Sequence, residues 1–365
     1  MTIIRSIGLA TPTHAVSQQS AAELLVALSN ADDERARFIR AIHRRSGVDQ
    51  RSSVIALPPP HGPQPTQDFF RHDQPAPSTA HRMARYATDA PVLATAAARA
   101  ALTASGTQPS AITHLITASC TGFGAPGLDI ALVDALTLSP DTTRTHIGFM
   151  GCHAAINAVR IADATARASP DATVLLVCAE LCSLHLQVDP TPDQVVSNAL
   201  FSDGAAALVV TPDTASPGWR IRATASHLIP DTRGAMSWRI GDVGFQMSLA
   251  ESVPAVIREQ LAQWLLPWLA RFGIGPAHLP SLGWAIHPGG PKVLDAVRDS
   301  LTLPESCLEH ARRTLRFQGN MSSPTVLFIL DDIARTTDTT RAILLAFGPG
   351  LTIEAALLER VPGRT

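Results

Sequence analysis

Three residues of types that carry out nucleophilic catalysis lie within two residues of a glycine. Cys152 follows Gly151 and the string IGFM, and His287 follows the string WAI and precedes PGG. Asn320 follows Gly319. We predict that each lies where a strand or loop leads into a helix, which is where α/β proteins build their active sites.

The segment after Cys152 predicts an amphipathic helix over 154–168. Its apolar face is formed by Ala155, Ile156, Val159, Ala162 and Ala166. A helix N-terminus favours an anion by up to ~2 kcal/mol, or about 1.5 pKa units, and a protonated histidine would lower the thiol pKa further. Taken singly, the three residues have ordinary interpretations as a buried inert cysteine, a structural histidine and a capping asparagine.

Two other patterns indicate sites that we consider weaker. The string at 122–127 has the GxGxxG spacing of dinucleotide-binding loops, but no acidic residue ends the next predicted strand, 146–150. Cys178, Cys182 and His185 could supply part of a metal site, but no second pair of ligands lies near them in the sequence. We therefore expect neither a nucleotide site nor a metal centre.

The composition is that of a folded protein with a large core. Of 365 residues, 45% are hydrophobic and 16% are charged, and the formal net charge is -2. These values exclude an intrinsically disordered chain and argue against nucleic-acid binding through bulk positive charge. Five cysteines are too few for a disulfide scaffold, so we expect a reduced, cytoplasmic protein. We expect no signal peptide and no membrane span, because the most apolar stretch, 172–186, is short and contains Glu180.

Short apolar stretches alternate with helical patterns, which predicts an α/β fold with strands buried on both faces. A turn-rich segment at 211–218 is the expected boundary between two halves, 1–213 and 219–365, and proline-rich residues 57–77 should form an irregular loop. The expected strands are 2–7, 114–120, 146–150, 173–179, 205–210, 282–286 and 342–347. The expected helices are 21–28, 32–45, 79–105, 128–136, 154–168, 253–272, 292–301 and 324–334.

Five longer strings carry a family resemblance. GFMGCHAAINA, ALFSDGAAA, WAIHPGGPKVLDAV, GNMSSPTVLF and AFGPGLTIE resemble the chalcone and stilbene synthases, the type III polyketide synthases, and the similarity extends from about residue 3 to 359. The resemblance implies the thiolase fold, with two duplicated αβαβα halves, and a homodimer. It also implies decarboxylative condensation of malonyl-CoA onto an acyl-CoA starter without a metal or organic cofactor.

The resemblance assigns roles to individual residues. Cys152 matches the nucleophile that holds the growing chain as a thioester. His287 matches the residue that pairs with the thiolate, and together with Asn320 it donates hydrogen bonds to the thioester carbonyl. Such donors form an oxyanion hole, in which each is worth roughly 10²–10³ in rate. Phe201 matches a gatekeeper between the CoA tunnel and the cavity, and Met247 occupies the second gatekeeper position.

Further residues are assigned to the substrate cavity and to CoA binding. The cavity residues are Cys120, Thr121, Ala125, Cys182, His185, Trp238 and Ser322, with Ala125 at the position where plant members have a methionine that reaches across the dimer. The CoA-binding segment contains Arg40, Arg44, Arg45 and Arg51, which could equally form a solvated helix face.

The cavity residues are similar to those of bacterial rather than plant members. Thr121, Ala125 and Cys182 resemble enzymes that accept fatty acyl starters, and a tryptophan at 238 resembles alkylresorcinol synthases. We therefore expect a fatty acyl starter and an alkylresorcinol or alkylpyrone product. The alternative is an enzyme like ketoacyl-ACP synthase III, which stops after one condensation.

Overall fold

The computed structural model describes the chain except for residues 58–65, 68, 213–215 and 363–365. The strands of its large sheet are β1 (Thr2–Ala10), β6 (His114–Ser119), β7 (Thr143–Gly148), β8 (Val174–Leu181), β9 (Asp203–Thr211), β10 (Gly218–Leu228), β13 (Gly283–Ile286), β14 (Arg341–Gly348) and β15 (Thr352–Val361). Shorter antiparallel pairs join β2 (Ala15–Ser17) to β3 (Gln50–Ser52), β4 (Ala56–Leu57) to β5 (Thr66–Gln67), and β11 (Met236–Gly241) to β12 (Gly244–Leu249).

Helices cover the outer faces of this sheet and fill the space between its two groups of strands. They are α1 (Gln18–Leu28), α2 (Asp33–Arg45), α3 (Thr79–Ser105), α4 (Leu128–Leu136), α5 (Ala154–Ala168), α6 (Pro192–Leu200), α7 (Val253–Ala270), α8 (Pro291–Leu301), α9 (Glu309–Gln318) and α10 (Thr325–Thr336). None of the helices in the described part of the chain is both long and apolar enough to cross a membrane.

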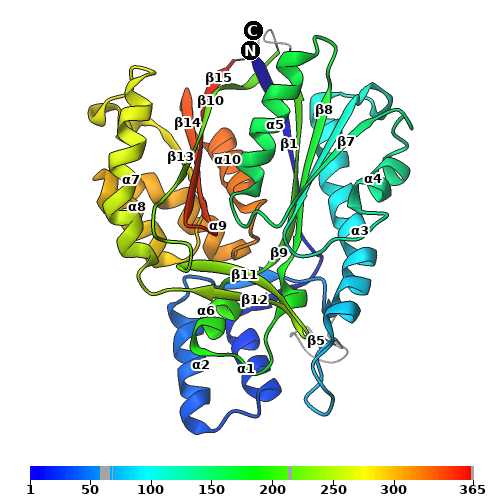
Figure 1. The fold of residues 1–365 in the computed structure, drawn as a ribbon, viewed down its shortest axis with the longest axis vertical. Coiled ribbons are helices and arrows are strands. Elements are labelled where there is room, and N and C mark those ends of the chain that lie inside the picture. The colour runs from blue at the N-terminus through cyan, green and yellow to red at the C-terminus, as the bar shows by residue number, and fades with distance from the viewer. Residues whose placement is uncertain (58–65, 68, 213–215, 363–365) are drawn as a thin grey trace.

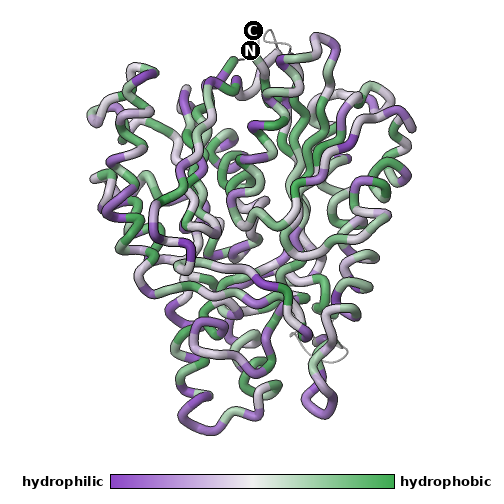
Figure 2. The backbone as a smooth tube through the Cα atoms, in the orientation of Figure 1, coloured by the Kyte–Doolittle hydropathy of each residue, from purple (hydrophilic) through white to green (hydrophobic). Residues whose placement is uncertain are grey.

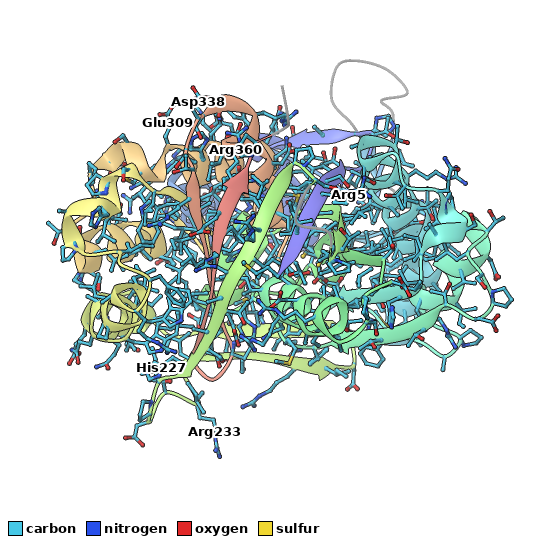
Figure 3. The ribbon with its side chains drawn as sticks, turned by 90° about the horizontal axis from the view of Figure 1, so that it is seen from above. Arg5, His227, Arg233, Glu309, Asp338 and Arg360 are labelled. Atoms are coloured by element: carbon cyan, nitrogen blue, oxygen red, sulfur yellow. The ribbon has the colours of Figure 1, made fainter. Side chains whose placement is uncertain are left out.

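The nine-stranded sheet consists of two groups of strands. Its order is β13-β14-β15-β10-β1-β9-β8-β6-β7, and the two groups meet where β1 pairs with β10. Seen from above, β1, β10 and β15 run side by side, with Arg5 and Arg360 near one end and His227 near the other (Figure 3). Helices α5 and α10 lie between the groups and contact strands of both (Figure 1). Because α3 and α4 cover one outer face and α7 and α8 the other, the layers follow the order αβαβα.

The sequence of each layer suits its position. All eight residues of β8 are buried, because α3 and α5 cover its two faces. Helix α5 is rich in buried alanines, so it can approach strands on both of its sides. Apolar residues gather along the strands and inner helix faces, whereas polar residues gather at the tips of α1 and α2 (Figure 2).

The predicted α/β class and the predicted helices are confirmed, and each predicted strand is present with shifted ends. Much of the predicted irregular loop, including Pro58 and Pro60, lies outside the described residues, as does the middle of the predicted boundary segment. The sequence patterns missed α6, α9, β10, β11, β12 and β15. Strand β10 has the polar string GWRIRATASHL and is only partly buried, so it lacks the apolar run that marks the other strands.

Candidate active site

Cys152 lies in the turn between β7 and α5. Gly151 in this turn has φ 83°, and a Cβ there would lie 2.5 Å from Cδ of Pro349, so glycine is required. The Gly151 N–H donates to Sγ of Cys120 at 2.9 Å. The turn is therefore held on two sides, and Cys152 is 8% exposed within it.

His287 and Asn320 are supplied by the C-terminal half. His287 directly follows β13, and its backbone N–H donates to the Leu345 carbonyl of β14 at 2.8 Å. Its ring is buried, and neither ring nitrogen has a hydrogen-bond partner among the described residues. Asn320 lies between α9 and α10, and its Oδ1 accepts from the Ser322 N–H at 2.8 Å. This bond orients the amide, so the NH₂ group is the end available to a substrate oxygen.

The structure brings these three residues to one small cavity, which we call the nucleophile cavity. It measures about 20 Å³ and is lined by Cys152, His287 and Asn320 together with Phe201 and Met247. The backbone of Phe201 forms a bridge with that of Asn320, so the two residues are positioned together. A nucleophile, an imidazole and an amide donor around one apolar space can perform acyl transfer and stabilise an oxyanion.

The protonation states at rest differ from the expectation of a lowered thiol pKa. Burial raises the pKa of Cys152 to about 12, opposed by the hydroxyl of Ser322. Burial lowers the pKa of His287 to about 3, and the nearby His153 adds to this effect. His153 is the N-cap of α5, so the thiol lies just outside the helix. The resting pair is therefore a neutral thiol and a neutral imidazole, because desolvation outweighs the helix N-terminus.

Two further cavities adjoin the nucleophile cavity and share Phe201 and Met247 with it. The inner cavity, of about 30 Å³, is lined by Cys152 and by predicted residues of the substrate cavity, namely Cys120, Thr121, Cys182, Trp238 and Ser322. The outer cavity, of about 350 Å³, is lined by Cys182, His185 and Trp238 and extends to α1, α2 and α6. Eight of the predicted cavity residues thus line these spaces.

Trp238 lines both the inner and the outer cavity, and it packs against His185, which lines the outer cavity. The Trp238 Nε1–H donates to the Cys120 carbonyl at 2.7 Å, and its ring meets the edge of the His185 ring. His185 bonds the Thr121 carbonyl through Nε2 (2.6 Å), accepts from the Phe245 N–H through Nδ1 (3.0 Å), and stacks on the Phe245 ring. With both nitrogens used and its pKa lowered to about 3 by burial, His185 is a neutral structural group.

Ala125 is an exception among the predicted cavity residues. It is exposed in the loop before α4 and lines none of the three cavities, so within a single chain it is not the cavity residue we predicted. The reason is topological: the loop containing Ala125 points outward, beside the exposed Phe123.

The predicted CoA-binding arginines differ in exposure and in hydrogen-bond partners. Arg44 and Arg45 are exposed at the end of α2, beside Gly47, where an added Cβ would lie 3.0 Å from Pro291 at the start of α8. Arg40 is partly exposed, and its Nε and Nη2 donate to the two carboxylate oxygens of Glu23, each at 2.7 Å.

Arg51 corrects the prediction. It is buried, and its Nη1 donates to the carbonyls of Asn198 and Phe201 at 2.6 and 2.8 Å. Because Nη1 and Nη2 of this buried guanidinium donate to the protein, Arg51 holds the backbone of Phe201 and is not free for a phosphate.

Glu180 is a site residue that the sequence analysis did not assign. Its carboxylate is fully buried beneath the inner cavity and accepts from the Cys120 N–H (2.8 Å), the Thr121 hydroxyl (2.7 Å) and the Ser323 hydroxyl (2.5 Å). Burial raises its pKa to about 7, which these hydrogen bonds oppose. The sequence feature that could have identified Glu180 is its position as a single acidic residue inside the most apolar strand.

Comparison with known proteins decides the family. A model of the chalcone and stilbene synthase N-terminal domain matches residues 1–214, and a model of the C-terminal domain of the same family matches residues 220–362. The chain belongs to the chalcone and stilbene synthase family. It is a type III polyketide synthase, an enzyme of the acyltransferase class, and these matches set aside the ketoacyl-ACP synthase III alternative.

Relatives of this type III polyketide synthase come from distant organisms. A 1,3,6,8-tetrahydroxynaphthalene synthase of Streptomyces peucetius subsp. caesius is 34% identical, over 98% of this chain and 93% of that protein. The solved type III domain of Steely1, a type I/III hybrid from Dictyostelium, is 26% identical with a TM-score of 0.88, over 99% of both chains. PKS-I from the brown alga Ectocarpus siliculosus is 25% identical with a TM-score of 0.89, over 99% of this chain and 98% of that one. These likenesses confirm the predicted thiolase-like fold.

Proposed function

We propose that this enzyme extends a fatty acyl starter, held on Cys152, with malonyl units to give an alkylresorcinol or alkylpyrone. The observation that carries the proposal is the outer cavity of about 350 Å³, which shares Phe201 and Met247 with the nucleophile cavity. Its walls include apolar side chains such as Leu24 and Ile55. Each methylene buried there contributes about 0.8 kcal/mol, so the cavity favours an alkyl tail.

In the proposed reaction the Cys152 thiol gives its proton to His287 and attacks the starter thioester, and CoA leaves. Malonyl-CoA then loses CO₂, and the electron pair of the broken C–C bond passes into an enolate. His287 and Asn320 donate hydrogen bonds to the enolate oxygen. The enolate carbon attacks the Cys152 thioester, the Cys152 thiolate leaves, and a chain two carbons longer remains on CoA. The Cys152 thiolate then attacks this new thioester and releases CoA, so that the next malonyl unit can be added, and cyclisation follows the last extension. The roles of His287 and Asn320 are supported by the free ring nitrogens of the one and the oriented amide of the other.

A second candidate uses a short starter. The Streptomyces relative is named for a naphthalene with four hydroxyl groups, which carries no alkyl tail. The spaces that touch Cys152 measure only about 20 and 30 Å³, which favours a compact acyl group at the nucleophile. In this case the outer cavity would receive the growing polyketide instead of the starter.

The two candidates are separated by incubating the enzyme with isotope-labelled malonyl-CoA, alone and with acyl-CoA starters from acetyl to palmitoyl. Mass spectrometry of the products counts the malonyl units and detects the starter. We expect products that contain an intact medium or long acyl tail. A hydroxylated naphthalene formed from malonyl-CoA alone, at a rate that no fatty acyl-CoA exceeds, would refute the fatty acyl proposal and support the second candidate.

We also propose that the enzyme is a homodimer. Strand β7 is the edge of the large sheet and is exposed except at Ile147, and Phe123 and Met150 add exposed apolar surface beside it. An open edge strand next to apolar surface suits pairing with a second copy. Light scattering should give twice the chain mass, and Met150→Glu should shift the mass toward that of one chain.

The remaining proposals concern CoA, cofactors and location. We propose that Arg44 and Arg45 bind the CoA phosphates, since both are exposed and no ion pair involves them in the described chain. We propose a cytoplasmic enzyme without metal or organic cofactor, because Cys152, His287 and Asn320 can supply every step and the five cysteines are unpaired. Dialysis against EDTA should leave the rate unchanged.

A further inference from the structure

His153, which directly follows the nucleophile, has no role in the proposed reaction, yet it is 2% exposed and begins a buried chain of hydrogen bonds. Its Nδ1 lies 2.7 Å from Oδ1 of Asn157, one turn further along α5. Nδ2 of Asn157 donates to Oε1 of Glu354 on β15 at 3.0 Å. The chain therefore connects the segment that carries the nucleophile to a strand of the C-terminal half.

The direction of each hydrogen bond is determined by the carboxylate at its end. Glu354 accepts from Asn157, from the Ser226 hydroxyl (2.7 Å) and from the Arg160 guanidinium. Because the Asn157 amide turns its NH₂ group to Glu354, its oxygen faces His153 and must accept. Nδ1 of His153 is therefore the protonated nitrogen, and the ring has one fixed tautomer and orientation.

The same ring is held by packing. A Cβ on Gly348 would lie 2.2 Å from Cδ2 and 2.6 Å from Nε2 of His153, so the ring lies directly on the β14–β15 turn. The next residue of this turn, Pro349, contacts Gly151 on the other side of the nucleophile. The turn thus contacts the residues immediately before and after Cys152.

This turn belongs to the strand that also positions His287. The His287 N–H donates to Leu345 in β14, three residues before Gly348. Contacts on β14 and its turn therefore relate the nucleophile, from the N-terminal half, to the imidazole, from the C-terminal half. The acyl-transfer step needs such alignment, since a misplacement of about 1 Å can cost about 10²-fold in rate.

We propose that His153 is a positioning residue, which the Asn157–Glu354 chain orients so that it holds Cys152 within reach of His287. The proposal rests on the proposed roles of Cys152 and His287 but not on the identity of the starter. The new element is His153: this side chain touches no substrate, yet it sets the reactivity of the Cys152 thiol.

The test replaces His153 by Phe, which keeps a ring but cannot donate, and by Gln, which can donate to Asn157. We expect His153→Phe to lower kcat for malonyl-CoA turnover at least about tenfold, with KM within about twofold. Alkylation of Cys152 by iodoacetamide near pH 7 should slow about fivefold or more. His153→Gln should restore much of both. His227→Phe, which changes a half-buried histidine on β10 stacked on Trp264, is the matched control.

Asn157→Leu is the second variant, since it breaks both hydrogen bonds and leaves the ring of His153 in place. It should reproduce the loss of kcat and the slower alkylation of Cys152 even if His153→Phe folds poorly. Unchanged kcat and alkylation in either folded variant would overturn the proposal, as would losses that only follow the melting temperature and that Gln does not restore. Activity retained by Cys152→Ala would instead overturn the proposed function.

Discussion

We expect Trp238 to control how far a bound chain can extend from Cys152. Its indole lines both the inner and the outer cavity, and its Nε1–H bonds the Cys120 carbonyl at 2.7 Å. Trp238→Ala should join the two spaces and give an acyl chain a continuous apolar path. Trp238→Phe removes the hydrogen bond but keeps most of the ring, so it separates the effect of bulk from that of the bond.

The size of the effect follows from burial. If the joined path removes four more methylenes from water, at about 0.8 kcal/mol each, the gain is about 3 kcal/mol, or about 200-fold in relative kcat/KM. The substitution also has a structural cost. Full truncation of a buried tryptophan costs 3–5 kcal/mol, and since Trp238 is only half-buried we expect about 2 kcal/mol.

The assay is kcat/KM for saturated acyl-CoA starters from acetyl to palmitoyl, with product masses. We expect Trp238→Ala to favour longer starters or longer products relative to wild type, with condensation retained. Trp264→Ala is the matched control, because this half-buried tryptophan stacks on Trp268 and lines none of the three cavities. A folded Trp238→Ala enzyme with the wild-type order of starters and the wild-type product would refute the reasoning.

Further substitutions test the roles assigned to the other residues. Cys152→Ala should abolish polyketide formation while the protein stays folded, and a labelled starter found on another cysteine of the intact enzyme would contradict the assignment. Asn320→Ala should lower malonyl-CoA decarboxylation about 10²-fold or more, so near-normal release of labelled CO₂ would show that the amide is only structural. Neutralising Arg44 and Arg45 together should raise KM for CoA esters but not for short thioester analogues; equal effects on both would place the CoA site elsewhere. Folding raises the pKa of Glu180 from 4.5 to about 7, so the protonated carboxyl stabilises the fold at low pH and this contribution is lost as pH rises through about 7. The loss in free energy of unfolding between about pH 4 and pH 8 should therefore be about 3 kcal/mol smaller in Glu180→Gln than in wild type, and equal pH dependence in denaturant titrations would mean that the carboxyl is not buried and protonated as described.

The strand and helix pattern of this protein could be predicted wherever burial is uniform. Strand β8 is a nearly continuous apolar run, because both of its faces are covered, and helix α5 has apolar residues at helical spacing. The β11–β12 hairpin could not be predicted in the same way. Its strings MSWRIG and GFQMSL mix exposed and buried residues, since the hairpin faces the cavities on one side and solvent on the other.

The identities of the site residues could be predicted from the sequence, but their burial and protonation could not. Cys152 and Asn320 are recognisable because each follows a glycine with positive φ, and His287 because it ends an apolar stretch and is followed by Pro-Gly-Gly. The sequence does not reveal the burial that raises the pKa of the Cys152 thiol, because this burial depends on contacts from both halves. Arg51 was misplaced for a similar reason, because a basic segment does not show which arginine turns inward.

The sequence by itself determined the family, the α/β class and the identity of the nucleophile, since these depend on local strings and on periodicity along a few turns of chain. Tertiary structure alone decided which side chains meet. Residues 152, 287 and 320 come from separate segments, and so do the walls of the outer cavity, which depend on how α1, α2 and α6 pack against Phe201 and Trp238. The carboxylate of Glu180 and the chain from His153 to Glu354 likewise exist only after folding, because their hydrogen bonds join residues that lie far apart in the sequence.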